Sequence, residues 1–105
     1  GLNEVQIGMT MHHVGIELAR ARLTPSAFNR SVINAEMFDP ADAVDAGFLD
    51  KVVPAEELEA TALAMAKQLA GLNMTAHRNT KLKTRKAFLE LLDSSIEADK
   101  QHSLS

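Results

Sequence analysis

Three features of the chain have residue types and spacings that could carry chemistry, and the first is a carboxylate close to its start. Glu4 lies among alternating apolar and polar residues, four positions before Gly8. A glycine within a strand lets a ligand or another backbone approach closely. A glutamate on an exposed strand is more often a solvated surface residue, so position alone leaves a functional and a purely structural interpretation open.

The second feature is a pair of adjacent histidines, His12 and His13. Side chains of neighbouring residues point in different directions, whereas a helical zinc site uses histidines four positions apart. No third nitrogen or carboxylate at a useful spacing completes a metal site. The simplest interpretation is that one histidine packs or caps a helix while the other is solvated.

The third feature is a basic segment over residues 77–86. It contains five of the chain's 11 Lys and Arg residues and no acid, whereas the remainder of the chain has six cations and 14 acids. Such a run is usually a solvated helix face. The alternative is an anchor for a phosphorylated ligand, held by charge-assisted hydrogen bonds.

Composition narrows the classes of protein to which the chain can belong. Its 105 residues suffice for one domain, and the net charge of −3 argues against nucleic-acid binding. The absence of cysteine excludes disulfides and thiolate sites. The apolar stretches are too short to span a membrane, and the first residues do not resemble a signal peptide. We therefore expect a cytoplasmic protein that binds neither nucleic acid nor membrane.

The elements that must position these residues are predicted to be mainly α-helical. Residues 5–11 alternate apolar and polar side chains, the pattern of a strand with one buried face. Thr24 with Pro25, and Asp39 with Pro40, each combine a helix cap with a proline in the first turn. The expected helices cover residues 12–23, 24–38, a short segment from Asp39 that ends at Gly47, 55–70 and 75–100.

The order of these segments is similar to that of a known family. Residues 3–8, Asn-Glu-Val-Gln-Ile-Gly, resemble the Pro-Glu-Ile/Val-x-x-Gly strand of the crotonase (enoyl-CoA hydratase/isomerase) superfamily, and the Arg-Leu pair at 22–23 ends the helix that follows. Residues 38–58 resemble the family signature A-x-E-A-x-x-x-G-L-V-x-x-V-V-P-x-x-x-L. The similarity covers essentially the whole chain, yet it corresponds to the C-terminal portion of a family member only.

This resemblance implies a fold and an activity. Family members fold as an α/β spiral followed by helices that assemble trimers or dimers of trimers, and they bind acyl-CoA thioesters. Residues 1–23 would be the end of the spiral, including its last strand, and residues 24–105 a helical region that mediates oligomerisation. Glu4 matches one of two carboxylates that act on water and on the α-carbon proton in the hydratases. An enolate needs oriented donors for its oxygen and a carboxylate that moves the proton.

The resemblance also implies roles for the other candidate residues. His12 lies eight residues after Glu4, where some isomerases of the family place a second acid. His12 and His13 are therefore expected to line the substrate pocket. The cations expected to contact the phosphates of coenzyme A are Lys81, Lys83 and Lys86.

The chain departs from the family pattern in one segment. The Gly-rich stretch that lines the acyl pocket is replaced by residues 11–19, in which Gly15 is retained. The two oxyanion N–H groups and the second hydratase carboxylate would precede Gly1. No metal or redox cofactor is implied, because the substrate is the coenzyme A thioester itself.

Two hypotheses follow from the sequence. The first is the C-terminal fragment of an acyl-CoA hydratase or isomerase, inactive alone, whose partners are the missing N-terminal part of the same enzyme and further copies of the chain. The second is a non-catalytic helical module that mediates oligomerisation.

Overall fold

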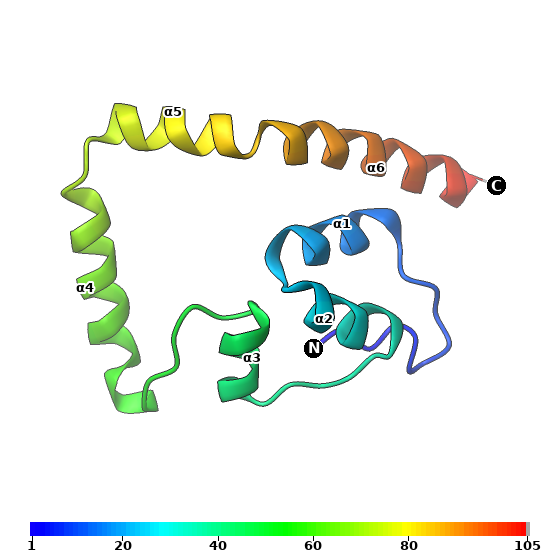
Figure 1. The fold of residues 1–105 in the computed structure, drawn as a ribbon, viewed down its shortest axis with the longest axis horizontal. Helices are drawn as coiled ribbons and strands as arrows, with labels where there is room; N and C mark the ends of the chain where they lie inside the picture. Colours follow the sequence, from blue (N-terminus) through cyan, green and yellow to red (C-terminus); the bar gives the residue numbers. More distant parts are fainter. Residues whose placement is uncertain (105) are drawn as a thin grey trace.

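The computed structural model describes residues 1–104 and shows a chain of helices joined by short connections (Figure 1). The α-helices are α1 (His13–Arg22), α2 (Pro25–Phe28), α3 (Pro40–Ala46), α4 (Leu58–Ala70), α5 (Met74–Thr84) and α6 (Lys86–Leu104). A π-helical turn, η1 (Asn29–Ile33), continues α2, and a 3₁₀ turn, η2 (Ala55–Glu57), precedes α4. The mainly helical fold expected from the sequence is confirmed. Ser105, the last residue of the expected helical region, lies outside the described residues.

The strand predicted for residues 5–11 is wrong, since no segment between residues 1 and 104 forms a β-strand. Residues 4–8 form consecutive turns, in which the N–H of Met9 donates to the carbonyl of Glu4 at 2.7 Å and Gly8 has a φ of 83°. Val5, Ile7 and Met9 are all exposed, so their alternation buries no face. A strand must pair its backbone groups with a neighbouring strand, and without one the turns pair them locally.

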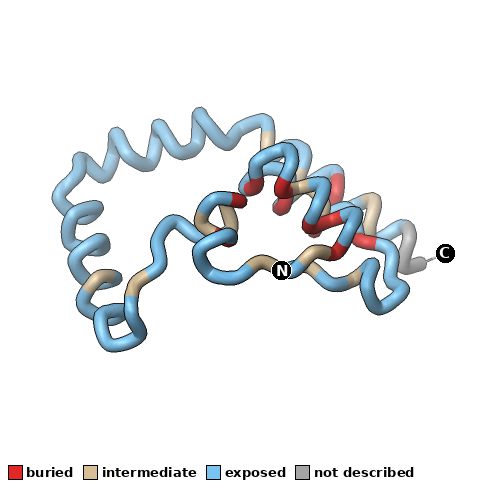
Figure 2. Tube along the Cα trace, turned by 60° about the horizontal axis from the view of Figure 1, so that its bottom comes forward, coloured by how far each residue is buried: buried red, intermediate tan, exposed pale blue. Residues whose placement is uncertain are grey.

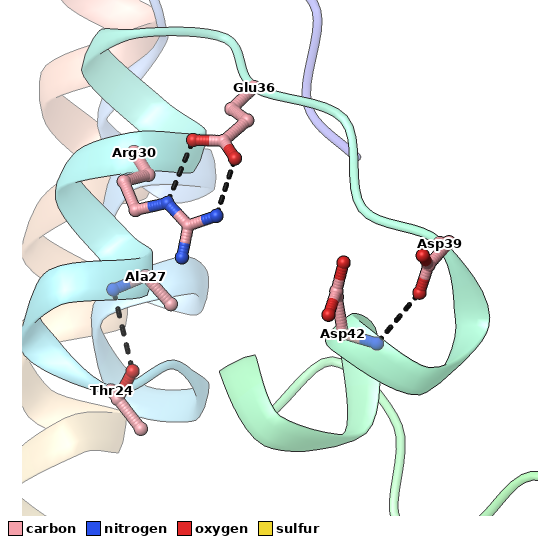
Figure 3. Close-up of polar contacts among 6 residues, drawn as sticks. All are labelled: Thr24, Ala27, Arg30, Glu36, Asp39 and Asp42. Carbon is pink, nitrogen blue, oxygen red and sulfur yellow. Dashed lines mark hydrogen bonds and ion pairs between the residues drawn. The ribbon is translucent and has the colours of Figure 1, made fainter.

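Both predicted proline-containing caps are present (Figure 3). The Thr24 hydroxyl accepts a hydrogen bond from the N–H of Ala27 at 3.4 Å, and the Asp39 carboxylate accepts one from the N–H of Asp42 at 2.8 Å. These side chains satisfy N–H groups that have no partner within the first turn of a helix. Gly47 ends α3, as predicted, and its backbone adopts the left-handed conformation.

The helix predicted over residues 24–38 is shorter than expected. It passes through η1, and Ala35 then adopts a positive φ of 53°. The Arg30 guanidinium holds the carboxylate of Glu36 through two hydrogen bonds (Figure 3), and the N–H of Glu36 donates to the carbonyl of Arg30. This hydrogen-bonded pair lowers the pKa of Glu36 and fixes the connection to α3.

The long helix predicted over residues 75–100 is divided in two at Arg85. Arg85 has φ −101° and ψ 5°, outside the helical range. The hydroxyl of Thr84 donates to the carbonyls of Thr80 and Lys81, which competes with the regular backbone pattern and helps to end α5 there. The helix predicted over 55–70 also differs, because its first turn is the 3₁₀ turn η2.

Figure 2 shows the buried residues gathered in one part of the molecule. Most of them lie in or next to α1, α2, η1 and α3. The last helix, α6, returns to pack against α1, so helices that are far apart in the sequence lie side by side (Figure 1). The core is small and built largely from short side chains, namely Met11, Ala19, Leu23, Ala27, Val32 and Ala46. Ser95 of α6 is also buried, with its hydroxyl bonded to the carbonyl of Leu91.

Helices α4 and α5 form an arm that leaves this core (Figure 1). Neither helix has a buried residue, and Leu58, Met65 and Leu69 are exposed. The radius of gyration is 16.8 Å, whereas a compact chain of this length has roughly 13 Å. Among residues 1–104, no helix is both long and apolar enough to cross a membrane.

The contact between the ends of α1 and α3 gives the first prediction, at Gly47. Its φ is 105°, and a Cβ atom there would lie 2.6 Å from the carbonyl oxygen of Arg22. Gly47→Ala in the full-length protein should therefore lower the free energy of unfolding by about 1–3 kcal/mol, measured by chemical denaturation.

Gly71→Ala is the matched control. Gly71 has a helical φ of −76°, and an added Cβ would meet no atom closer than 3.4 Å. This substitution should leave stability unchanged or raise it slightly. Equal losses at both positions would show that the close approach at Gly47 is not the cause.

Candidate active site

A pocket of about 300 Å³ lies beside the first turns of α1. The initial segment, α1 and Phe48 supply its walls. Its apolar lining consists of Leu2, Met11, Leu18, Ala19, Leu23 and Phe48. Glu4, His12, Gly15 and Arg22 complete the wall. An apolar pocket with few polar groups is typical of a small-molecule site.

Glu4 is the carboxylate of this pocket. Its side chain is half-buried, and its Oε2 atom is buried with no hydrogen-bond partner among the described residues. The turns that replace the predicted strand bring the side chain into the pocket wall rather than into solvent. Because buried carboxylate oxygens normally have partners, an open acceptor here is suited to taking a proton from a bound ligand.

His12 lines the same pocket. It is the N-cap residue of α1, yet its side chain makes no capping hydrogen bond. The imidazole instead lies next to Gly15, where an added Cβ would come within 2.9 Å of Cε1 and 3.1 Å of Nε2. Gly15 therefore provides space that the Met11 side chain and the His12 ring both occupy.

His13 is not part of the pocket wall. It is exposed, and its backbone N–H donates to the carboxylate of Asp99 at 2.8 Å. The N–H of Val14 donates to the second oxygen of the same carboxylate at 2.9 Å. Both bonds lower the pKa of Asp99, and the bond from Val14 has the larger effect. A residue of α6 thus caps α1.

Arg22 closes one side of the pocket. Its guanidinium donates to the carboxylate of Asp50 at 2.7 Å, an exposed ion pair that ties the end of α1 to the segment after α3. The charge of Arg22 is therefore directed to Asp50, and the pocket interior remains mostly apolar.

The basic segment is separate from the Glu4 pocket. Lys81 lines an open hollow of about 670 Å³ between α4 and α5, together with His77 and Arg85, and this hollow shares no lining residue with the pocket. Lys83 and Lys86 are exposed and do not line it. The described residues therefore do not bring the three lysines together with Glu4.

Sequence reasoning did not find Asp99. Its partners lie 85 and 86 positions away, so no local pattern reveals the cap. Among the side chains that the structure describes, which end at Gln101, no group of three or more metal-ligating residues is arranged to hold an ion.

A half-buried carboxylate in an apolar pocket on a helical scaffold defines a candidate proton-transfer site. Over residues 1–104 the chain matches the sequence model of the enoyl-CoA hydratase/isomerase family. The chain belongs to this family.

Solved structures and a curated relative agree with this assignment. A family protein from Pseudomonas syringae is 70% identical, with a TM-score of 0.95 over 97% of this chain and 44% of that one. An enoyl-CoA hydratase from Mycobacterium ulcerans is 36% identical, with a TM-score of 0.89 over 94% of this chain and 43% of that one. The human mitochondrial enoyl-CoA delta isomerase 1 is 31% identical over the whole chain, which spans 35% of that protein. The chain thus spans less than half the length of these relatives.

The unpartnered oxygen of Glu4 gives a prediction about stability. Glu4→Met keeps a side chain of similar length and removes the buried oxygen, so in the full-length protein it should raise the free energy of unfolding by about 1–2 kcal/mol. Chemical denaturation measures the change. Glu56→Met, at an exposed position, is the control and should have little effect. A less stable Glu4→Met protein would show that the carboxylate has stabilising partners.

Proposed function

We propose that the chain is the C-terminal portion of an acyl-CoA hydratase or isomerase in which Glu4 moves a proton to or from the substrate. The observation that carries the proposal is the buried, unpartnered Oε2 of Glu4 in an apolar pocket of a chain from this family. A carboxylate without a protein partner is available to a substrate proton.

The proposed chemistry proceeds through a thioester enolate. The apolar side chains of the pocket hold the acyl chain beside Glu4. Loss of the α-carbon proton to the carboxylate leaves an enolate, and return of a proton at another carbon moves the double bond. In a hydratase the same group acts on water. The oxyanion donors are proposed to lie in the part of the enzyme that precedes Gly1.

Hydratase and isomerase both remain candidates within this proposal. The relatives include a protein named as a hydratase and one named as an isomerase, at 36% and 31% identity. Assays with a 2-enoyl-CoA and with a 3-enoyl-CoA separate the two activities. The cytoplasmic location expected from composition stays a prediction.

We also propose that residues 1–23 complete the catalytic core of the longer polypeptide and that residues 24–105 mediate homo-oligomer formation. The support is the exposed apolar surface of α4 and α5, including Leu58 and Met65. Covering apolar side chains of this size with a neighbouring chain removes them from water, which stabilises the assembly.

A non-catalytic oligomerisation module is the second candidate, and the same exposed arm favours it. The two candidates differ in what they expect of the full-length protein. An enzyme turns over enoyl-CoA thioesters and depends on Glu4, whereas the module oligomerises and shows no turnover.

Glu4→Gln in the full-length protein is the direct test of the catalytic proposal. The amide keeps the size of the side chain and loses the group that accepts the proton, so kcat should fall by roughly 10²–10⁴-fold. Binding of acyl-CoA, measured by calorimetry, should change little. Glu17→Gln, on α1 and outside the pocket wall, is the control. Unchanged turnover in Glu4→Gln would exclude Glu4 as the acid or base.

The role proposed for the basic segment is tested separately. If Lys81, Lys83 and Lys86 bind the phosphates of coenzyme A, replacing all three by alanine should raise KM and leave kcat unchanged. The comparison is a CoA thioester against a pantetheine thioester that lacks the nucleotide. The rise in KM should be confined to the CoA thioester. An equal rise in KM for both substrates would show that the lysines form only a solvated helix face.

A further inference from the structure

Helix α1 begins without help from its own N-cap residue. His12 occupies that position with an extended backbone, and its side chain makes no capping bond. The first N–H groups of a helix still require acceptors. The acceptors are the two carboxylate oxygens of Asp99 on α6, at 2.8 Å from the nitrogen of His13 and 2.9 Å from that of Val14.

This division of roles has a consequence for the pocket. A side chain that caps its own helix must fold back over the first turn. Because Asp99 supplies the cap, the imidazole of His12 is left in the pocket wall that also contains Glu4. Gly15 leaves room for the ring there, since an added Cβ would lie 2.9 Å from His12 Cε1.

The position of Asp99 is itself well determined. Helix α6 packs along α1, and Ser95, one turn before Asp99, is buried with 6% of its surface exposed. The carboxylate lies at the N-terminal end of α1, where the helix dipole favours a negative charge. The bonds to Val14 and His13 lower the pKa of Asp99, which keeps the cap ionised at neutral pH.

We propose that Asp99 is a positioning residue that fixes the start of α1 and thereby holds the His12 side chain in the wall of the Glu4 pocket. The C-terminal helix is then a part of the site, although none of its residues lines the pocket. The kinetic part of this proposal rests on the proposed function.

A double-mutant cycle in the full-length enzyme tests the proposal. Asp99→Ala and His12→Ala should each lower kcat/KM by roughly 10-fold to 100-fold, the cost of a displaced active-site group. If Asp99 acts through His12, adding Asp99→Ala to His12→Ala should cause no further loss of kcat/KM. Independent losses that multiply in the double variant would overturn the proposal.

Two further variants separate positioning from general stability. Asp93→Ala removes an exposed carboxylate from the same helix and should leave kcat/KM unchanged. Asp99→Asn retains one acceptor oxygen and should restore part of the activity lost in Asp99→Ala. The melting temperature should fall with Asp99→Ala in both His12 backgrounds, whereas the loss of kcat/KM appears only when His12 is present.

An NMR measurement, which does not depend on enzymatic activity, tests the structural part of the proposal. With the histidine rings isotopically labelled, nuclear Overhauser contacts between the His12 ring and the Gly15 α-protons should be present in the native protein. They should be lost in Asp99→Ala and weakened in Asp99→Asn. Unchanged contacts in folded Asp99→Ala would overturn the proposal. A native enzyme without activity on enoyl-CoA thioesters would remove the proposed function and leave this test intact.

Discussion

The capping of α1 by Asp99 is the constraint on which the arrangement of the two chain ends depends. The chain leaves its core through α4 and α5 and returns only with α6, which packs along α1 (Figure 1). The carboxylate forms two hydrogen bonds with backbone N–H groups of His13 and Val14 at the positive end of a helix. Bonds to a charged acceptor are stronger than neutral ones, and here they join residues 85 and 86 positions apart.

The pocket next to this contact combines features that do not favour stability. Glu4 presents a buried oxygen without a partner, and Gly15 leaves room for an imidazole that caps nothing. Such arrangements cost free energy and are concentrated where proteins bind and convert ligands. The chain belongs to the enoyl-CoA hydratase/isomerase family, and the function proposed above assigns this carboxylate the transfer of a proton next to a thioester.

The sequence predicted local features well and extended features less well. The caps at Thr24 and Asp39 and the left-handed Gly47 were found because each depends on residues within one helical turn. The strand at residues 5–11 was wrong because alternation describes a half-buried strand only where a neighbouring strand exists. The helix predicted over 75–100 is interrupted at Arg85, where the Thr84 hydroxyl donates to two backbone carbonyls. The periodicity of apolar residues contains no information about such bonds.

By itself, the sequence determined the mainly helical content, the helix caps at Thr24 and Asp39, the end of α3 at Gly47, and the choice of Glu4 and His12 as candidates. Those properties follow from local propensities and from a motif within a few residues. The tertiary structure decided which candidates share a pocket: Glu4 and His12 do, whereas His13 and the three lysines lie elsewhere. It also decided that Asp99 caps α1. Such a contact depends on how α6 packs against α1, and packing between distant segments leaves no local periodicity in the sequence.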